Sequence, residues 1–177
     1  MKNRTKNPWK RDFCNFLGII LYFDKILWII ISYSSDENGT PMGLWFSKIT
    51  HLYHLAKQEN IEMTIASIRG GKVPIDPESL RPMLTDRITK KCWNDEKFWK
   101  ILENIPSLAG ISWEKFDAIY LAGGRGIMYD FPENTDLQAI IAVHYEARKI
   151  VSAACHGVGG LLNVRISNGK NLIADKK

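Results

Sequence analysis

Residues 149–162 of this 177-residue chain contain a cysteine in a position from which a nucleophile could be presented. An apolar, β-branched run predicts a strand that stops at Cys155, and a glycine-rich segment with helical tendency follows it. A thiol on such a strand-to-helix turn lies at a helix N-terminus, where the dipole favours the thiolate. Ala153 and Gly157 supply the small neighbours that a crowded turn needs. We therefore predict that Cys155 is a nucleophile; the alternative is a buried structural cysteine, since a free cysteine packs like a small hydrophobic residue.

Residues beside the thiol and on an earlier turn could complete such a site. His156 follows Cys155 directly, and either assists thiolate formation or has a structural role. Gly123 and Gly124 follow a predicted strand, and glycines let backbone N–H groups approach an oxyanion closely. The alternative for these glycines is a plain strand–loop turn. Because the G-G-x-G pattern lacks the full dinucleotide fingerprint, we expect no nucleotide cofactor.

Alternating strand and helix patterns predict a doubly wound, mostly parallel α/β sheet. The predicted strands are 25–33, 61–66, 116–121 and 150–154, and the chain end at 171–177 resembles the start of another strand. The predicted helices are 43–58, 95–104 and 134–147, with a helix of about two turns after Cys155. Both glycine-rich turns then lie at carboxyl ends of strands, where such folds place their sites.

Composition and charge exclude several classes of protein. Hydrophobic residues make up 45% and charged residues 24% of the chain, as in globular proteins. The net charge of +5 comes mainly from basic residues at the N-terminus, and no basic stripe interleaved with aromatics follows, so we expect no nucleic-acid partner. These basic residues are Lys2, Arg4, Lys6, Lys10 and Arg11.

The cysteines and histidines do not form metal-binding patterns. Cys14, Cys92 and Cys155 are widely spaced and lack a C-x-x-C pair, which argues against a disulfide framework or structural zinc and for a reducing, cytoplasmic compartment. His51 and His54 lie three residues apart on a predicted helix, but no third ligand accompanies them. We therefore expect no metal site.

Residues 1–24 form an N-terminal extension, and residues 25–177 form the domain. The apolar runs at 16–23 and 26–31 are both shorter than the about 18–20 residues that a membrane span needs. Asp24 and Lys25 separate them, which makes a single joined span costly. The extension is therefore read as a leader or a weak membrane association, and the second run as the first strand of the domain.

Four motifs resemble one known family. They read G-T-P-M-G-L-W-F-S-K-I-T-H-L-Y, I-A-S-I-R-G-G-K-V-P-I-D-P-E-S-L, F-D-A-I-Y-L-A-G-G-R-G-I-M-Y-D-F-P and I-V-S-A-A-C-H-G-V-G-G-L-L-N-V. Together they resemble the ThiJ/PfpI superfamily, also described as type 1 glutamine amidotransferase-like. Within it, they resemble the glyoxalase III-like and heat-shock-chaperone-like branch. The resemblance extends over residues 25–177 in order.

The resemblance implies a flavodoxin-like α/β fold and cysteine chemistry. It implies Cys155 as nucleophile, His156 as its partner, and oxyanion donors near Gly124 and His156, with Gly123 and Gly157 completing the substrate-binding turns. The implied substrate is a small dicarbonyl such as methylglyoxal, converted to lactate without glutathione, metal or another cofactor. Deglycase, chaperone-like, peptidase and stress-response roles also occur in the family, and homodimerisation is an open alternative.

Three departures from the family pattern affect this expectation. The first helix of the family carries a glutamate in S-E-x-x-H-x-Y, and Lys48 occupies that position. The family's G-G-H-G reads G-G-R-G here, with Arg125 in place of histidine. The chain also ends before the family's C-terminal elements. We therefore expect impaired turnover, with a catalytically degenerate, partner-binding or chaperone-like chain as the alternative. An uncovered apolar strand edge further predicts marginal stability or dependence on a partner chain.

Overall fold

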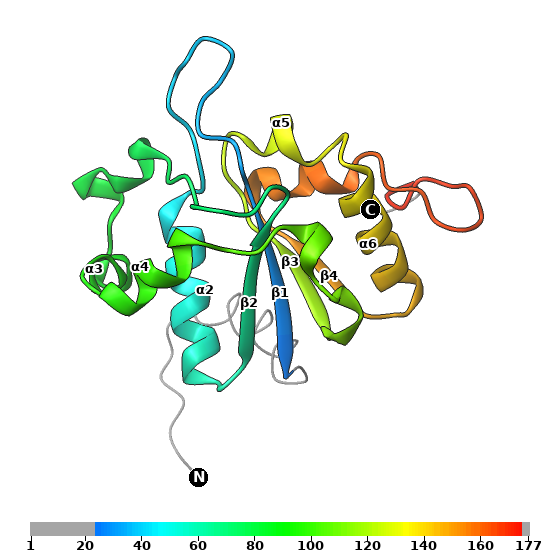
Figure 1. The fold of residues 1–177 in the computed structure, drawn as a ribbon, viewed down its shortest axis with the longest axis horizontal. Coiled ribbons are helices and arrows are strands. Elements are labelled where there is room, and N and C mark those ends of the chain that lie inside the picture. Colours follow the sequence, from blue (N-terminus) through cyan, green and yellow to red (C-terminus); the bar gives the residue numbers. More distant parts are fainter. Residues whose placement is uncertain (1–23, 175–177) are drawn as a thin grey trace, which may run out of the picture.

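Four parallel strands form one sheet in the order β2-β1-β3-β4 (Figure 1). The computed structural model describes residues 24–174. Its strands are β1 (Lys25–Ile30), β2 (Glu62–Ser67), β3 (Ala118–Leu121) and β4 (Ile150–Ala153). The predicted flavodoxin-like α/β fold is confirmed.

Helices cover the two faces of this sheet. In Figure 1, α2 (Phe46–Gln58), α3 (Arg87–Trp93) and α4 (Glu96–Glu103) lie to the left of the sheet, and α6 (Thr135–Glu146) lies to its right. Between β3 and α6 comes the single turn α5 (Ile127–Asp130). The 3₁₀-helices are η1 (Pro77–Leu80), η2 (Pro82–Leu84), η3 (Leu108–Gly110), η4 (Trp113–Lys115) and η5 (Cys155–Leu161).

The central strand β1 forms the middle of the core. Every residue from Ile26 to Ile31 is buried, because a parallel strand covered on both faces needs apolar side chains on both. Its Trp28 ring contacts the Tyr120 ring on β3 edge-on, with centroids 6.0 Å apart. The unbroken apolar run in the sequence is therefore explained by burial inside the sheet rather than by a membrane. None of the helices in the described part of the chain is long and apolar enough to cross a bilayer.

Several predicted boundaries differ from the structure. The first helix begins at Phe46 rather than at residue 43, because the backbone of Leu44 instead bonds Pro74 and Asp76 in the neighbouring loop. Helix α3 and the turn α5 were not predicted. The strand predicted from residue 171 is wrong within the described residues, since 171–174 form turns and one bridge to Arg165. A tight reversal with Gly169 at φ 79° returns the chain there instead of extending it.

Strand β4 is an edge of the described sheet. All four of its residues are half-buried, whereas all four residues of the neighbouring β3 are buried. The expected apolar edge is therefore present in the described chain. The marginal stability that we inferred from it stays a prediction. The predicted N-terminal extension, residues 1–24, lies outside the described residues except for Asp24.

A buried histidine on α6 predicts a pH-dependent stability. His144 is 1% exposed, its Nδ1 lies 3.1 Å from the Ile140 carbonyl oxygen, and its ring contacts Trp113. Burial lowers the pKa of His144 below its ordinary value, with Lys149 adding to the effect and Glu114 opposing it. The folded chain therefore keeps this imidazole neutral, while the unfolded chain binds a proton below about pH 6.5.

We expect the free energy of unfolding to fall as the pH drops below about 6.5, because protonation then favours the unfolded chain. The His144→Phe variant should lose this part of the pH dependence while it keeps a ring against Trp113. Urea unfolding of both chains above and below that pH measures the difference. Equal pH slopes in the two chains would show that His144 contributes nothing.

Candidate functional site

Cys155 lies on a tight turn directly after β4. Its backbone has φ 54°, in the left-handed region that side-chain-bearing residues seldom adopt, and such strain collects at functional sites. The thiol is exposed, and its Sγ lies 3.3 Å from Nδ1 of His156. Cys155 begins the 3₁₀-helix η5 rather than an α-helix. The structure thus places the predicted cysteine and histidine together at the carboxyl edge of the sheet.

Two glycines make this turn sterically possible. A Cβ atom on Gly123 would lie 2.5 Å from the Ala154 carbonyl oxygen and 2.6 Å from the Cys155 Cβ. A Cβ on Gly157 would lie 2.2 Å from the Leu121 carbonyl oxygen. All three distances are shorter than real Cβ contacts, so the turns after β3 and β4 pack backbone against backbone. The sequence prediction that these two turns converge is confirmed.

Substitution of Gly157 tests this close approach. We expect Gly157→Ala to lower the free energy of unfolding by about 1–3 kcal/mol, because the new methyl group must displace the backbone of β3. Gly110→Ala is the matched control, since its Cβ would find only the Ser107 Oγ at 3.8 Å. Chemical unfolding of both variants measures the contrast. An equal, small effect in the two would contradict the packing described for the Cys155 turn.

The first turn of α2 adjoins the same turns. The Trp45 N–H donates to the Gly123 carbonyl oxygen at 3.4 Å, and Leu44 forms an isolated bridge with Gly124. Gly124 is also tightly enclosed, because its Cβ would lie 2.3 Å from the Gly43 carbonyl oxygen. Lys48 is half-buried in the first turn of α2. This cation therefore belongs to the helix end that borders the cysteine turn.

Arg125 is held by a buried carboxylate beside the site. Its Nε and one terminal guanidinium nitrogen donate to the two carboxylate oxygens of Asp76 at 2.8 and 3.0 Å. Asp76 is fully buried, and it also caps η1 by accepting the Glu78 N–H. The bidentate pair raises the pKa of Arg125 further above its ordinary value. The arginine in G-G-R-G therefore ties the turn after β3 to the loop before η1.

Tyr120 on β3 is a neighbour of the site that sequence reasoning missed. Burial, followed by the charge of Cys155, raises the pKa of its phenol to about 12. The phenol is therefore protonated at neutral pH and can act as a hydrogen-bond donor. The sequence did not indicate this role, because a tyrosine within an apolar strand is typical of a core residue.

His51 on α2 contacts a carboxylate that caps the neighbouring helix. His51 Nε2 lies 2.6 Å from the Asp86 Oδ2, and Asp86 in turn caps α3 by accepting the Thr89 N–H. This contact joins α2 to α3. No cluster of three or more metal-ligating side chains occurs among residues 24–174.

Comparison with known proteins found related chains, although no family model matches the sequence. The probable glutathione-independent glyoxalase hsp3103 of Schizosaccharomyces pombe is 36% identical over 145 residues, which cover 68% of this chain and 55% of that protein. Among solved structures, the Rapid Encystment Protein 24 KDa of Francisella tularensis has a TM-score of 0.78 at 35% identity, covering 85% of this chain and 66% of that one. Glyoxalase III from Candida albicans has a TM-score of 0.74 at 26% identity, covering 84% and 64%.

The chain belongs to the ThiJ/PfpI superfamily. Within it, the similarity is to the glyoxalase III-like branch, as the sequence motifs predicted. The chain spans about half the length of the fission yeast glyoxalases it matches, with 54–56% of each of three covered.

As a ThiJ/PfpI protein, the chain brings most of its predicted site residues together. Cys155 and His156 are in contact, Gly123 and Gly157 shape the turn around them, and Gly124 joins that turn to α2. Asp76 was not predicted as a site neighbour, although the Asp-Pro pair that opens η1 is a recognisable helix-start signal.

Proposed function

We propose that this chain is a cysteine-dependent, glyoxalase III-like enzyme that acts on small dicarbonyls such as methylglyoxal without a cofactor. The observation that carries the proposal is the exposed Cys155 thiol on a left-handed turn, with His156 Nδ1 at 3.3 Å. The names of the related glyoxalases support the choice of substrate class. Cytoplasmic localisation, homodimerisation and a weak membrane association of residues 1–24 stay predictions.

The first step of the proposed reaction is addition of the thiol to the aldehyde. His156 takes the proton of Cys155, and the thiolate sulfur forms a bond to the aldehyde carbon. The carbonyl electron pair moves to oxygen, which backbone N–H groups near Gly124 and His156 stabilise before it takes up a proton. The product is a hemithioacetal on Cys155.

The second step moves a proton between the two substrate carbons. A base removes the proton from the former aldehyde carbon while the ketone oxygen takes up a proton, which gives an enediol. A proton then returns to the former ketone carbon and the other hydroxyl loses its proton, which leaves a thioester on Cys155. Water then adds to the thioester, the carbon–sulfur bond breaks, and lactate and the free thiol are released. Methylglyoxal plus water gives lactate, so the net reaction needs no external oxidant or reductant.

Lys48 leaves this second step without the base that the family's glutamate would supply. It occupies the family's glutamate position at the end of α2 that borders the cysteine turn, but a protonated amine cannot accept the proton. We therefore propose that proton transfer, rather than thiol addition, limits turnover in this chain. Lys48 is also the observation that favours the second candidate, a catalytically degenerate chain with a partner-binding or chaperone-like role.

The experiment that tests the proposal compares lactate formation from methylglyoxal by the wild-type chain and by Cys155→Ala. We expect wild-type turnover above the uncatalysed rate and none in the variant. Cys92→Ala is the matched control and should keep wild-type turnover, because Cys92 is buried and burial raises the pKa of its thiol. Equal, background rates in wild type and Cys155→Ala would end the enzymatic proposal in favour of the degenerate chain.

A further inference from the structure

The insertion between β2 and β3 exposes an unusual set of large apolar side chains. Met83 is 97% exposed and Leu84 47% exposed on η2, and Trp93 is 48% exposed at the end of α3. The Trp93 ring packs edge-on against Phe46 and Trp99, and its carbonyl oxygen accepts the Trp99 Nε1–H at 2.7 Å. The half-exposed indole is therefore held in place by the fold rather than left free.

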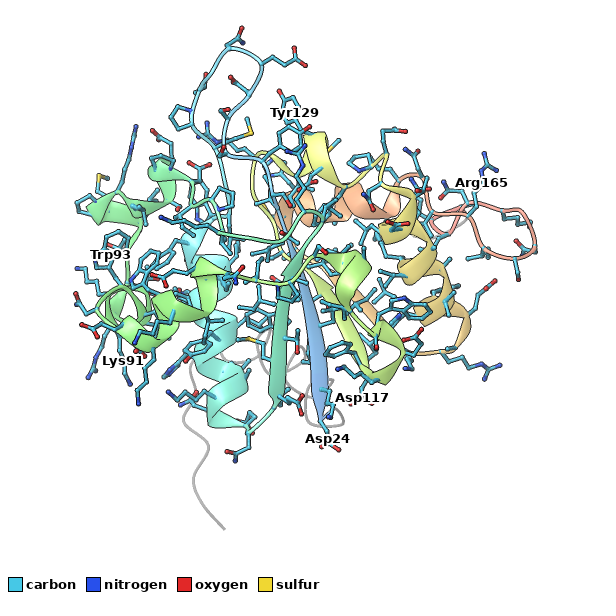
Figure 2. All side chains as sticks on the ribbon, in the orientation of Figure 1. Asp24, Lys91, Trp93, Asp117, Tyr129 and Arg165 are labelled. Atoms are coloured by element: carbon cyan, nitrogen blue, oxygen red, sulfur yellow. The ribbon has the colours of Figure 1, made fainter. Side chains whose placement is uncertain are left out.

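The same segment exposes several cations on α3 and α4. Arg87, Lys90 and Lys91 lie on the face of α3 opposite the buried Thr89 and Cys92, because residues three and four apart share a helix face. Figure 2 shows Lys91 and Trp93 at the outer end of this helix pair, away from the sheet.

On α4, Lys97 and Lys100 lie opposite the buried Phe98 and Leu102 in the same way. These two lysines and the three cations of α3 have no side-chain ion pair or hydrogen bond within residues 24–174.

The carboxylates of the segment balance only part of this charge. Asp86 is engaged by His51 and by the Thr89 N–H, and Asp95 caps α4. Glu96 and Glu103 on α4 have no such partner among residues 24–174, where the five cations are also unpaired. With four carboxylates against five cations, the segment from Asp86 to Glu103 carries a formal net charge of +1 next to exposed hydrocarbon.

We propose that this surface, formed by η2 and the outer faces of α3 and α4, docks onto an anionic lipid bilayer. Met83 and Leu84 would enter the boundary between headgroups and acyl chains, and Trp93 would lie at headgroup level, which indole rings prefer. The cations of α3 and α4 would meet the anionic headgroups, each contributing attraction close to the membrane surface. A nucleic acid would contact the cations but would leave Met83 and Leu84 without an apolar partner. An anionic lipid surface can contact both the cations and the apolar side chains.

Vesicle co-sedimentation of the full chain tests this proposal. We expect binding to phosphatidylcholine vesicles that contain phosphatidylserine, and little binding to phosphatidylcholine alone. Lys90→Glu/Lys91→Glu should weaken binding about 25-fold or more, because each such cation contributes about 5-fold near an anionic surface. Met83→Ser/Leu84→Ser should also weaken it, since both side chains are exposed and their replacement leaves the core unchanged.

A matched pair of charge reversals separates local docking from overall charge. Lys72→Glu/Lys170→Glu makes the same charge change at two exposed lysines outside this surface and should bind like the wild type. Equal binding by all three variants would place the contact elsewhere, for example in residues 1–24, and would overturn the proposal. Equal binding to neutral vesicles, or binding to RNA without binding to vesicles, would overturn it as well.

Discussion

The Lys48→Glu variant is expected to convert methylglyoxal to lactate with kcat/KM raised about 100-fold over the wild-type chain. A positioned general base contributes about 10²- to 10⁴-fold to such a proton transfer, and the lower end applies to a carboxylate placed by one substitution. Lys48 lies in the first turn of α2, whose N-terminus is bonded through Trp45 to Gly123 beside Cys155. We expect a carboxylate at this helix end to accept the proton that the substrate carbon must lose.

Steady-state kinetics of two variants isolate this base. Lys48→Gln removes the cation without adding a base, so it should gain much less than Lys48→Glu. The gain of the glutamate variant should lie mainly in kcat, because the base acts in the proton-transfer step rather than in binding. If Lys48→Glu and Lys48→Gln had the same rate as the wild type, proton transfer at this position would not limit turnover.

The Asp76→Ala variant is expected to lose about 2–3 kcal/mol of unfolding free energy. Asp76 is fully buried and receives two guanidinium hydrogen bonds from Arg125 as well as the capping N–H of Glu78. Removing one partner of a buried pair costs about 3–5 kcal/mol when the other stays buried. Arg125 is 44% exposed and can be hydrated when Asp76 is removed, so the expected cost lies below that range.

A double-mutant cycle checks that this loss comes from the pair. Arg125→Ala leaves the buried Asp76 carboxylate without its cation and should also destabilise the chain. The double variant Asp76→Ala/Arg125→Ala should be clearly more stable than the sum of the two losses implies. Strict additivity in urea unfolding would mean that the two residues stabilise the fold independently.

The sequence predicted the sheet and the convergence of its two glycine turns because both depend on local patterns. The apolar run of β1 and the strand–turn patterns at Gly123 and Cys155 are readable within short windows. The parallel order then follows from the connections, since strand–helix–strand units place the carboxyl ends of strands at one edge. Position on that edge brought Cys155 and Gly123 together.

The features that were not predicted depend on contacts between distant residues. The start of α2 was wrong because the backbone of Leu44 bonds Pro74 and Asp76, which lie some thirty residues later. The Arg125–Asp76 pair joins residues 49 positions apart, and no local pattern links a G-G-R-G turn to that loop. The turn at Cys155 was predicted to be strained and crowded, but its left-handed φ was not predicted, because that angle follows from the packing of two turns against each other.

The most direct test of the central claim measures lactate formation from methylglyoxal by Lys48→Glu and by Lys48→Glu/Cys155→Ala. With the base restored, we expect the rate of the reaction at the Cys155 thiol to exceed the uncatalysed rate clearly enough to be measured. We predict that the single variant is active and that the double variant falls to the uncatalysed rate. Equal activity in the two would contradict the assignment of Cys155 as the nucleophile.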